Sequence, residues 1–417
     1  MNNEQLYFSD DFVIQDNSAK IWIYAVHGHY KREINRSMMK ILSMYDTQTN
    51  IGTNVSRISI ALSIEQTLLE EIVKSLIGIF FTRTESKNKC YLHQNRPPNP
   101  KLERVFIEVT NKCNLMCQHC YMGNPNYATL SLNNFKKIID NFSDTGIYRI
   151  DLTGGEPFTD SEILEKIAYC HEKGYLVRIF TNGVLISDDI AENLSEMGVQ
   201  HVFVSLDSSN PKFHDSFRGK VGSFNDTIAA IKRLTRCGIP VTINSMLTPD
   251  NKDGVIELVT LAKNLGVSIR MSPLLPVGRA YGKDVVSNSV ISNSFKLIDD
   301  GKIIHSPCNN PCPSCGVGHT MIYVHSNGDA VLCPTLSKEQ KPNFYMGNVI
   351  SGDVADVLER FHFISHTTHI SCKYSECKHI KYCNGGCRSR AFIMTGDISE
   401  KDEVSCYLYD ALSNIDS

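Results

Sequence analysis

Three cysteines stand close together in the first half of the chain: Cys113, Cys117 and Cys120. They follow the apolar run at residues 105–110, which predicts a strand, so the three thiols lie in a loop at a strand end. Three thiolates leave a 4Fe–4S cube one ligand short, because such a cube normally takes four cysteines. The open iron could then bind a group that is not protein. A structural zinc site or unrelated buried cysteines are the alternatives, although zinc sites favour C-x2-C pairs.

The spacing C-x3-C-x2-C, followed at once by Tyr121, resembles the signature of the radical S-adenosylmethionine (SAM) enzymes. In that family, the methionine end of SAM fills the open site of the cluster. The resemblance implies that Cys113, Cys117 and Cys120 are the catalytic, metal-binding residues and that Tyr121 lies beside the bound cofactor.

Strands and helices alternate from residue 105 to about residue 276. Strands are predicted at residues 105–110, 147–153, 176–181, 201–206, 240–247 and 268–274. Helical patterns fall between them, near residues 131–142, 161–173, 188–197, 224–237 and 255–265. Six such repeats predict an α/β fold in which a parallel sheet closes partly into a (β/α)6 TIM-like barrel. Functional residues should then gather at the carboxyl ends of the strands.

Polar motifs occupy these predicted carboxyl ends. Gly154 and Gly155 would let backbone approach a ligand, and the carboxylate of Glu156 could accept a hydrogen bond from an ammonium group. Arg218 offers a fork of donors that suits a carboxylate. Each feature alone more often marks a turn or a surface ion pair. The evidence for a ligand site is therefore that they follow the cysteine loop in this order. The radical SAM resemblance implies SAM contacts from Tyr121, Gly154, Gly155, Glu156, Pro157, Asn182, Ser205 and Arg218.

The carboxyl-terminal part is rich in cysteine, with nine of the fifteen cysteines between Cys308 and Cys406. It resembles the SPASM domain, which follows radical SAM cores and carries two auxiliary 4Fe–4S clusters. The resemblance assigns to the first auxiliary cluster Cys315, Cys333 and Cys387, with Cys308 or its rival Cys312. It assigns to the second Cys372, Cys377, Cys383 and Cys406. The gap between Cys372 and Cys377 is two residues longer than in the family pattern, which affects loop geometry more than ligation. Two zinc sites of four thiolates each are the alternative.

Residues 10–85 predict a small α/β module. Strands at 12–14 and 21–26 precede a helix near 38–45, a second helix that opens at Ser63 with Gln66 as capping partner, and a strand at 80–82. This order resembles the winged-helix RiPP recognition element, which binds the leader of a ribosomally made precursor peptide. Strand addition to an exposed sheet edge is then the expected binding mode. A packing or dimerisation module is the alternative.

Proline-rich residues 96–100 would interrupt a helix or a central strand, so they mark a domain boundary. In chain order we expect a recognition domain at 1–90, a linker at 91–104, the radical SAM partial barrel at 105–280, a bridging segment at 281–307 and the SPASM domain at 308–417.

The composition of the chain argues against some classes of partner. The 417 residues carry a net charge of −3 and no basic block, which argues against a nucleic-acid partner. The amino terminus lacks a secretory signal pattern, and no apolar run approaches the ~20 residues that a bilayer-spanning helix needs. We therefore expect a cytoplasmic protein without a membrane partner, whose fifteen cysteines bind metal or stay reduced rather than form disulfides.

The resemblances together imply a radical SAM peptide maturase with SAM and three 4Fe–4S clusters, reduced by a protein such as flavodoxin or ferredoxin. It would abstract hydrogen from a precursor peptide and install a crosslink, first of all a cysteine thioether, as sactipeptide maturases do. A carbon–carbon crosslinking maturase shares every motif. A sulfatase-maturing enzyme shares the core and the tail but places an acidic base where Pro334 stands here. An iron–sulfur electron carrier or a peptide-binding chaperone is the non-enzyme alternative, although neither needs Gly154, Ser205 and Arg218 together.

Overall fold

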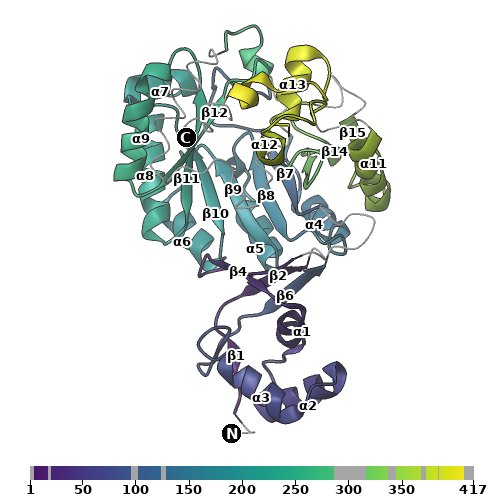
Figure 1. Ribbon diagram of the computed structural model, residues 1–417. Coiled ribbons are helices and arrows are strands. Elements are labelled where there is room, and N and C mark those ends of the chain that lie inside the picture. Colours follow the sequence, from purple (N-terminus) through teal and green to yellow (C-terminus); the bar gives the residue numbers. More distant parts are fainter. Residues whose placement is uncertain are drawn as a thin grey trace.

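The structure is a computed structural model that describes residues 4–16, 20–94, 102–123, 128–285, 316–336, 344–367, 372–383 and 385–407. Its largest part is an α/β domain, and a smaller amino-terminal module lies below it (Figure 1). The carboxyl-terminal elements, in green and yellow, lie along one side of the large domain and at its upper end.

One nine-stranded sheet runs through the large domain, in the order β12-β11-β10-β9-β8-β7-β13-β14-β15. Six of these are the predicted parallel strands: β7 (Arg104–Thr110), β8 (Arg149–Gly154), β9 (Leu176–Thr181), β10 (His201–Ser205), β11 (Val241–Leu247) and β12 (Ser268–Pro273). Each pairs in parallel with its neighbour in the chain, which confirms the predicted order. Among the described strands β12 and β15 are the edges, so the sheet is open rather than a closed barrel.

Helices connect the strands and bury one face of the sheet. The predicted helices are present as α4 (Leu132–Asn141), α5 (Ile163–Glu172), α6 (Asp188–Glu196), α8 (Ser223–Arg236) and α9 (Val255–Asn264). Further short helices are α7 (Pro211–Arg218), η1 (Pro157–Thr159), η2 (Lys252–Gly254) and η3 (Gly278–Ala280). Alternate apolar residues of β7, namely Val105, Ile107 and Val109, belong to the continuous core of this domain. Glu108, between them, therefore points to the opposite face of the sheet.

The carboxyl-terminal chain extends the same sheet. A hairpin is formed by β13 (Met321–Val324) and β14 (Asp329–Val331), and β15 (Tyr345–Asn348) follows. β13 pairs in parallel with β7, the strand that leads into the cysteine loop. The helices described in this part are α11 (Val354–Thr367), α12 (Ile380–Cys383) and α13 (Arg388–Thr395). The pairing of β13 with β7 lies outside the sequence predictions, because no local pattern names a partner strand so distant in the chain.

The amino-terminal module has two small sheets and three helices. Its four-stranded sheet has the order β4-β3-β2-β6 and contains β2 (Phe12–Asp16), β3 (Ile21–Ala25), β4 (Lys31–Ile34) and β6 (Cys90–Gln94). β1 (Tyr7–Phe8) pairs with β5 (Phe81–Thr82), and the helices are α1 (Arg36–Met44), α2 (Ile51–Leu62) and α3 (Gln66–Ser75). β6 pairs with β2, so the module's sheet extends past the expected boundary at residue 90 into the expected linker.

The predicted helix start at Ser63 is wrong. Ser63 has a φ of 53° and ends α2, where its N–H donates to the carbonyl of Ser59; α3 then begins after Glu65 without a side-chain cap. The sequence matches a capping box, but the left-handed conformation of Ser63 belongs to a helix end. Asn50 is the true cap of the missed helix α2, since its Oδ1 accepts from the N–H of Thr53 at 2.8 Å.

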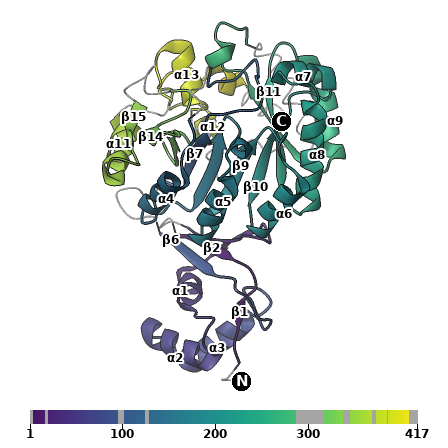
Figure 2. The ribbon, with the colours of Figure 1, turned by 180° about the vertical axis from the view of Figure 1, so that it is seen from behind.

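The module contacts the large domain where the parallel strands begin. Tyr24 donates a hydrogen bond to Tyr148 at 3.1 Å, just before β8, and the two rings stack. His93 Nε2 lies 3.0 Å from the carbonyl oxygen of Gly174, just before β9. The carboxyl ends of the strands, where the cysteine loop starts, therefore lie at the far end of the large domain from the module (Figures 1 and 2).

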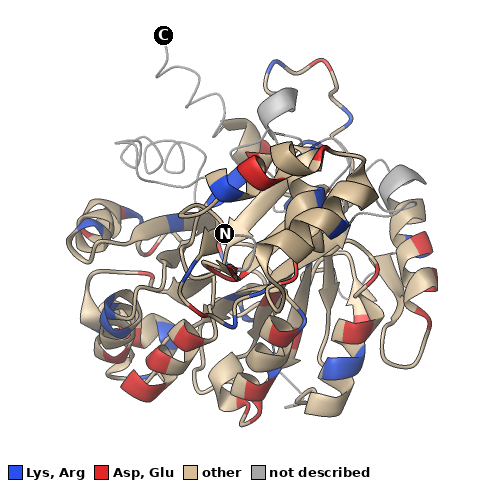
Figure 3. Cartoon of the chain, turned by 90° about the horizontal axis from the view of Figure 1, so that it is seen from below, with Lys and Arg blue, Asp and Glu red and all other residues tan. Residues whose placement is uncertain are grey.

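Seen from below, the module's end of the molecule shows Lys and Arg interspersed with Asp and Glu (Figure 3). Within the described ranges, no helix has the length and apolar character to cross a membrane.

Candidate active site

The cysteine loop lies directly after β7, at the carboxyl edge of the sheet. From one side, the carbonyl of Arg218, the last residue of α7, accepts a hydrogen bond from Met116 N–H at 3.1 Å. From the other side, Arg279 N–H in η3 donates to the carbonyl of Cys120 at 2.9 Å. Connections that follow β10 and β12 thus hold the loop between them, which explains how a segment without regular structure keeps a fixed shape.

The thiols of this loop are suited to an iron–sulfur cluster. Burial raises the pKa of Cys113 to about 11 and also raises that of Cys117, so without a metal both thiols keep their protons at neutral pH. The irons of a cluster supply the positive charge that stabilises thiolates. Among the described residues, no three His, Cys, Asp or Glu side chains are arranged to hold a single metal ion. Three sheltered thiols from one loop are a donor set that fits a cluster.

Gly154 and Gly155 bring two loops together. A Cβ atom on Gly154 would lie 2.1 Å from the carbonyl oxygen of Thr110, and one on Gly155 would lie 2.2 Å from that of Lys112. The N–H groups of Gly155 and Glu156 donate to these same carbonyls, each at 2.8 Å. The sequence predicts that the glycines let backbone approach a ligand. The structure gives them a different partner, the first residues of the cysteine loop.

Glu156 is fully buried, and protein groups already satisfy its carboxylate. Thr181 Oγ1 and Asn182 N–H donate to it at 2.7 Å each, and Phe158 N–H donates at 3.2 Å. Burial raises the pKa of Glu156 to about 7, against the lowering effect of these hydrogen bonds. The carboxylate therefore joins the loop after β8, where Pro157 begins η1, to the end of β9. Its contact with the amino group of SAM stays a prediction.

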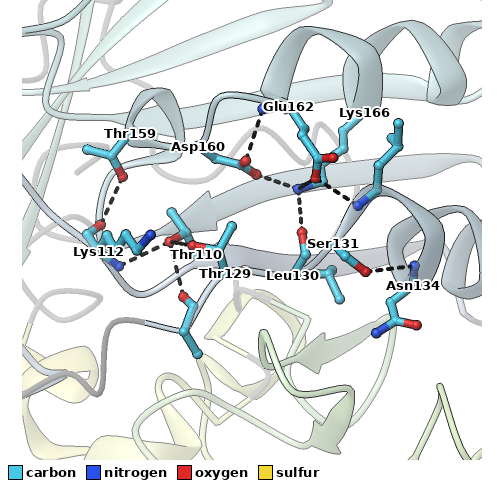
Figure 4. A network of polar contacts seen from close by, with 12 residues as sticks. Thr110, Lys112, Thr129, Leu130, Ser131, Asn134, Thr159, Asp160, Glu162 and Lys166 are labelled. Carbon is cyan, nitrogen blue, oxygen red and sulfur yellow. Dashed lines mark hydrogen bonds and ion pairs between the residues drawn. The ribbon is translucent and has the colours of Figure 1, made fainter.

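A buried lysine supports this loop (Figure 4). Lys166 of α5 has no exposed surface, and its Nζ donates to the carbonyl of Leu130 and to the carboxylate of Asp160. A buried ammonium is tolerated only when it is paired in this way, because its desolvation costs free energy. Thr159 Oγ1 lies 3.4 Å from the carbonyl oxygen of Lys112. Together these contacts tie the loop after β8 to the segment that leads into α4 and to the cysteine loop.

Asn182 contacts the cysteine loop from the end of β9. Its Nδ2 donates to Asn114 Oδ1 at 2.8 Å and lies 4.0 Å from Cys113 Sγ. Its Oδ1 accepts from Val184 N–H at 2.9 Å. Ser205, the last residue of β10, is partly exposed at the same edge of the sheet. The fold therefore brings both predicted SAM contacts to the edge that holds the cysteines.

Arg218 is paired with a protein carboxylate. Its Nε donates to Asp207 Oδ2 at 2.6 Å, and its Nη1 lies 3.7 Å from Cys117 Sγ. Burial alone would raise the pKa of Asp207, but the charge of Arg218, together with nearby histidines and the hydrogen bond from Met246, holds this pKa below its usual value. Asp207 Oδ1 also accepts from Met246 N–H at 2.8 Å. The sequence predicts a contact between Arg218 and the SAM carboxylate. It misses Asp207, because only the fold shows which carboxylate meets the guanidinium.

Four carboxyl-terminal cysteines surround one cavity. Cys372, Cys377, Cys383 and Cys406, the set predicted for the second auxiliary cluster, line a space of about 620 Å³. Burial raises the pKa of Cys383 to about 12 and raises that of Cys406, so these thiols also need a cationic centre to ionise. Four thiols around one open space fit a 4Fe–4S cluster.

The predicted ligands of the first auxiliary cluster are only partly described. Cys387 caps α13: its Sγ accepts from Arg390 N–H at 3.4 Å, while its own N–H donates to Asp402 at 2.8 Å. Cys333 Sγ lies 3.2 Å from Thr335 Oγ1. Cys308, Cys312 and Cys315 lie outside the described residues, so this cluster stays a prediction.

Comparison with known proteins places this site in a family. Residues 107–262 match the radical SAM superfamily. The AdoMet-dependent heme synthase of Methanosarcina barkeri is 28% identical over 341 residues, which cover 73% of this chain and 96% of that protein. The antilisterial bacteriocin subtilosin biosynthesis protein AlbA of Bacillus subtilis is 29% identical over 319 residues, 70% of this chain and 68% of that protein. Streptococcus suis SuiB, in its crystal structure with precursor peptide SuiA, shares the fold with a TM-score of 0.68 at 16% identity, over 96% of this chain and 100% of that one.

Proposed function

Since residues 107–262 of this chain match the radical SAM superfamily, we propose that it matures a ribosomally made precursor peptide by abstracting hydrogen from it and installing a crosslink. When bound, SAM and a reduced 4Fe–4S cluster supply a 5′-deoxyadenosyl radical, chemistry that no amino-acid side chain provides unaided. The observation that carries the proposal is an amino-terminal module with an exposed sheet edge, on a chain whose cysteine loop suits that chemistry.

The residues at the carboxyl edge would hold these groups in place. Cys113, Cys117 and Cys120 would bind the cluster and leave one iron for SAM. Arg218 places a positive charge beside Cys117, which favours its thiolate form. Around them, the loop after β8, Asn182 and Ser205 would contact SAM.

The exposed edge is β4, an outer strand of the module's sheet. Lys31, Arg32 and Glu33 are exposed. Ala25 N–H donates to the carbonyl of Tyr30 at 2.9 Å, and hydrogen-bonded pairs alternate with non-bonded pairs along an antiparallel ladder. The backbone groups of Lys31 and Glu33 therefore point away from β3 and can pair with an extended peptide. A leader bound here fits the names of two similar proteins, a bacteriocin biosynthesis protein and one crystallised with a precursor peptide.

For the product, we propose a cysteine thioether, with a carbon–carbon crosslink as the alternative that uses the same residues. The cysteine-lined cavity supports the proposal of a second auxiliary cluster, and Cys333 and Cys387 support that of a first. With the SAM-binding cluster, the proposed total is three. The auxiliary clusters would accept the electron left over when the crosslink closes. A flavodoxin or ferredoxin would reduce the SAM-binding cluster.

A proline on β4 tests leader binding. Glu33→Pro removes one outward N–H, and edge strands tolerate proline at such a position. We expect the precursor peptide encoded beside this chain's gene to bind at least tenfold more weakly, measured by fluorescence anisotropy of its labelled leader. Glu33→Ala is the matched control, because it removes the same side chain and keeps the N–H. Equal affinity of both variants for the leader would contradict strand addition at β4.

A small-molecule radical SAM enzyme is the second candidate. The heme synthase relative favours it, because 96% of that protein aligns with this chain at 28% identity. The amino-terminal module, with its exposed sheet edge, favours a peptide substrate instead. Incubation with SAM, reductant and the precursor peptide, followed by mass spectrometry, decides between the two: a crosslinked peptide supports the maturase, and a peptide that stays unchanged favours the small molecule.

A further inference from the structure

A buried glutamate and a half-buried histidine form a pair at the carboxyl edge of the sheet. Glu108 on β7 is 3% exposed, and its Oε2 lies 3.1 Å from Nδ1 of His325, which directly follows β13. β13 runs parallel to β7, with Val324 beside Ile107. The pair therefore stands at the end of the strand that leads into the cysteine loop. Neither residue belongs to the motifs that predict the SAM site.

The hydrogen bonds assign the proton of the histidine. The Oε1 of Glu108 accepts from Ser326 Oγ at 2.9 Å, and its Oε2 also accepts from Tyr323 Oη at 3.2 Å. Burial alone would raise the pKa of Glu108, but its hydrogen bonds with His325 and Ser326, together with the charge of a protonated His325, hold this pKa below its usual value. An ionised carboxylate can only accept, so in a neutral His325 the proton is on Nδ1 and Nε2 is an acceptor.

The side chain of His325 keeps solvent access although its carboxylate partner is buried. It is 23% exposed, whereas the side chain of Glu108 is 4% exposed. A base held by a hydrogen bond from its other nitrogen to a buried carboxylate is the arrangement that orients histidine for proton transfer.

A chain of hydroxyl groups connects this pair to the cysteine loop. Tyr323 Oη, bonded to Glu108, lies 3.2 Å from Tyr121 Oη, one residue after Cys120. Burial raises the pKa of Tyr121, and the negative charge of Glu108 raises it further. The two hydroxyl groups therefore join the Glu108–His325 pair to the residue that follows Cys120. Beside Cys333, Pro334 has no titratable group.

We propose that His325, oriented by Glu108, is the base that accepts the proton released when the crosslink closes. This inference rests on the proposed function. When a carbon radical of the peptide joins a thiol, the S–H bond breaks and the C–S bond forms. One proton and one electron leave: the proton goes to Nε2 of His325, and an oxidised iron–sulfur cluster held by the carboxyl-terminal cysteines would take up the electron. Glu108 is a positioning residue that offsets the charge of the resulting imidazolium.

His325→Asn tests the proposal, because the amide of asparagine can still donate to Glu108 but has no group in place of Nε2. The probe is the precursor peptide encoded beside this chain's gene, uniformly deuterated at carbon. We expect the variant to transfer deuterium to 5′-deoxyadenosine within twofold of the parent rate. The crosslinked product should fall about 100-fold, the typical contribution of a general base. The uncrosslinked peptide should return with a carbon-bound hydrogen in place of a deuterium.

Two further variants make the result specific. His325→Ala with added imidazole should recover part of the product, because imidazole can occupy the vacated space. Asn327→Ala, at an exposed position of the same turn, should match the parent in both deuterium transfer and product. All variants are compared at equal iron content per chain.

A His325→Asn enzyme that crosslinks as fast as the parent overturns the assignment of the base. A parent enzyme whose deoxyadenosine contains no deuterium from the peptide overturns the proposed peptide substrate instead, and with it this inference.

Discussion

The guanidinium of Arg218 lies between the carboxylate of Asp207, 2.6 Å from its Nε, and the thiol of Cys117, 3.7 Å from its Nη1. One buried cation thus stabilises a strand end and influences a cluster ligand. Breaking a buried pair leaves an uncompensated charge, whereas breaking an exposed pair leaves both groups in water.

Asp207→Asn should therefore lower the free energy of unfolding by about 3–5 kcal/mol, measured by urea denaturation. The matched control is Asp188→Asn, because Asp188 also pairs with arginines, Arg233 and Arg236, but on an exposed face. This control should leave the free energy of unfolding close to that of the parent, because water screens an exposed ion pair. Similar losses in both variants would show that the Asp207 pair is not stabilised by its burial.

Glu156 predicts a pH dependence of stability. Its pKa is about 7 in the folded protein, against a usual value of 4.5. Between pH 4.5 and about 7, the native state therefore keeps a proton that the unfolded chain has already released. Stability should therefore fall as pH rises from about 4.5 to about 7, by about 3 kcal/mol from this group. Glu156→Gln cannot titrate, so the difference between parent and variant isolates the effect. Parallel curves of unfolding free energy against pH would refute it.

The triad variant Cys113→Ala, Cys117→Ala, Cys120→Ala should form no 5′-deoxyadenosine under reductant. Of about twelve irons per chain after anaerobic reconstitution, about eight should remain. Cys237→Ala is the control, since Cys237 packs against the domain core away from this loop. Deoxyadenosine at the parent rate from the triad variant would disprove the assignment of the SAM-binding cluster.

Cys377→Ala should empty the cysteine-lined cavity of its metal. We expect iron to fall by about four per chain while SAM cleavage without peptide persists, because the SAM-binding loop is untouched. Iron and zinc are both measured by mass spectrometry. Zinc in the parent protein, lost in this variant, would establish a zinc site instead.

The sequence predicts well what local patterns determine. Apolar runs located every strand from β7 to β12, because these strands are buried in the core of the domain. The sequence prediction failed at Ser63. The residues match a capping box, but Ser63 adopts a left-handed conformation and ends helix α2. The motif residues lie at the carboxyl ends of the strands, as predicted, but the sequence did not identify the residues that they contact. Asp207 beside Arg218, and His325 beside Glu108, are contacts between distant segments that only the folded sheet creates.

The placement of the amino-terminal module has a consequence for peptide length. β7 has seven residues and spans about 23 Å from the end near the module to the cysteine loop, at ~3.3 Å per residue. A peptide docked on β4 must cover at least this height, and an extended chain advances at most ~3.6 Å per residue. About seven residues must therefore separate the docked segment from the reacting carbon. Precursors with a shorter spacer cannot react while docked, and longer spacers lower the effective concentration of the reacting segment at the radical. The enzyme would thus select its target residue by distance along the chain as well as by chemistry.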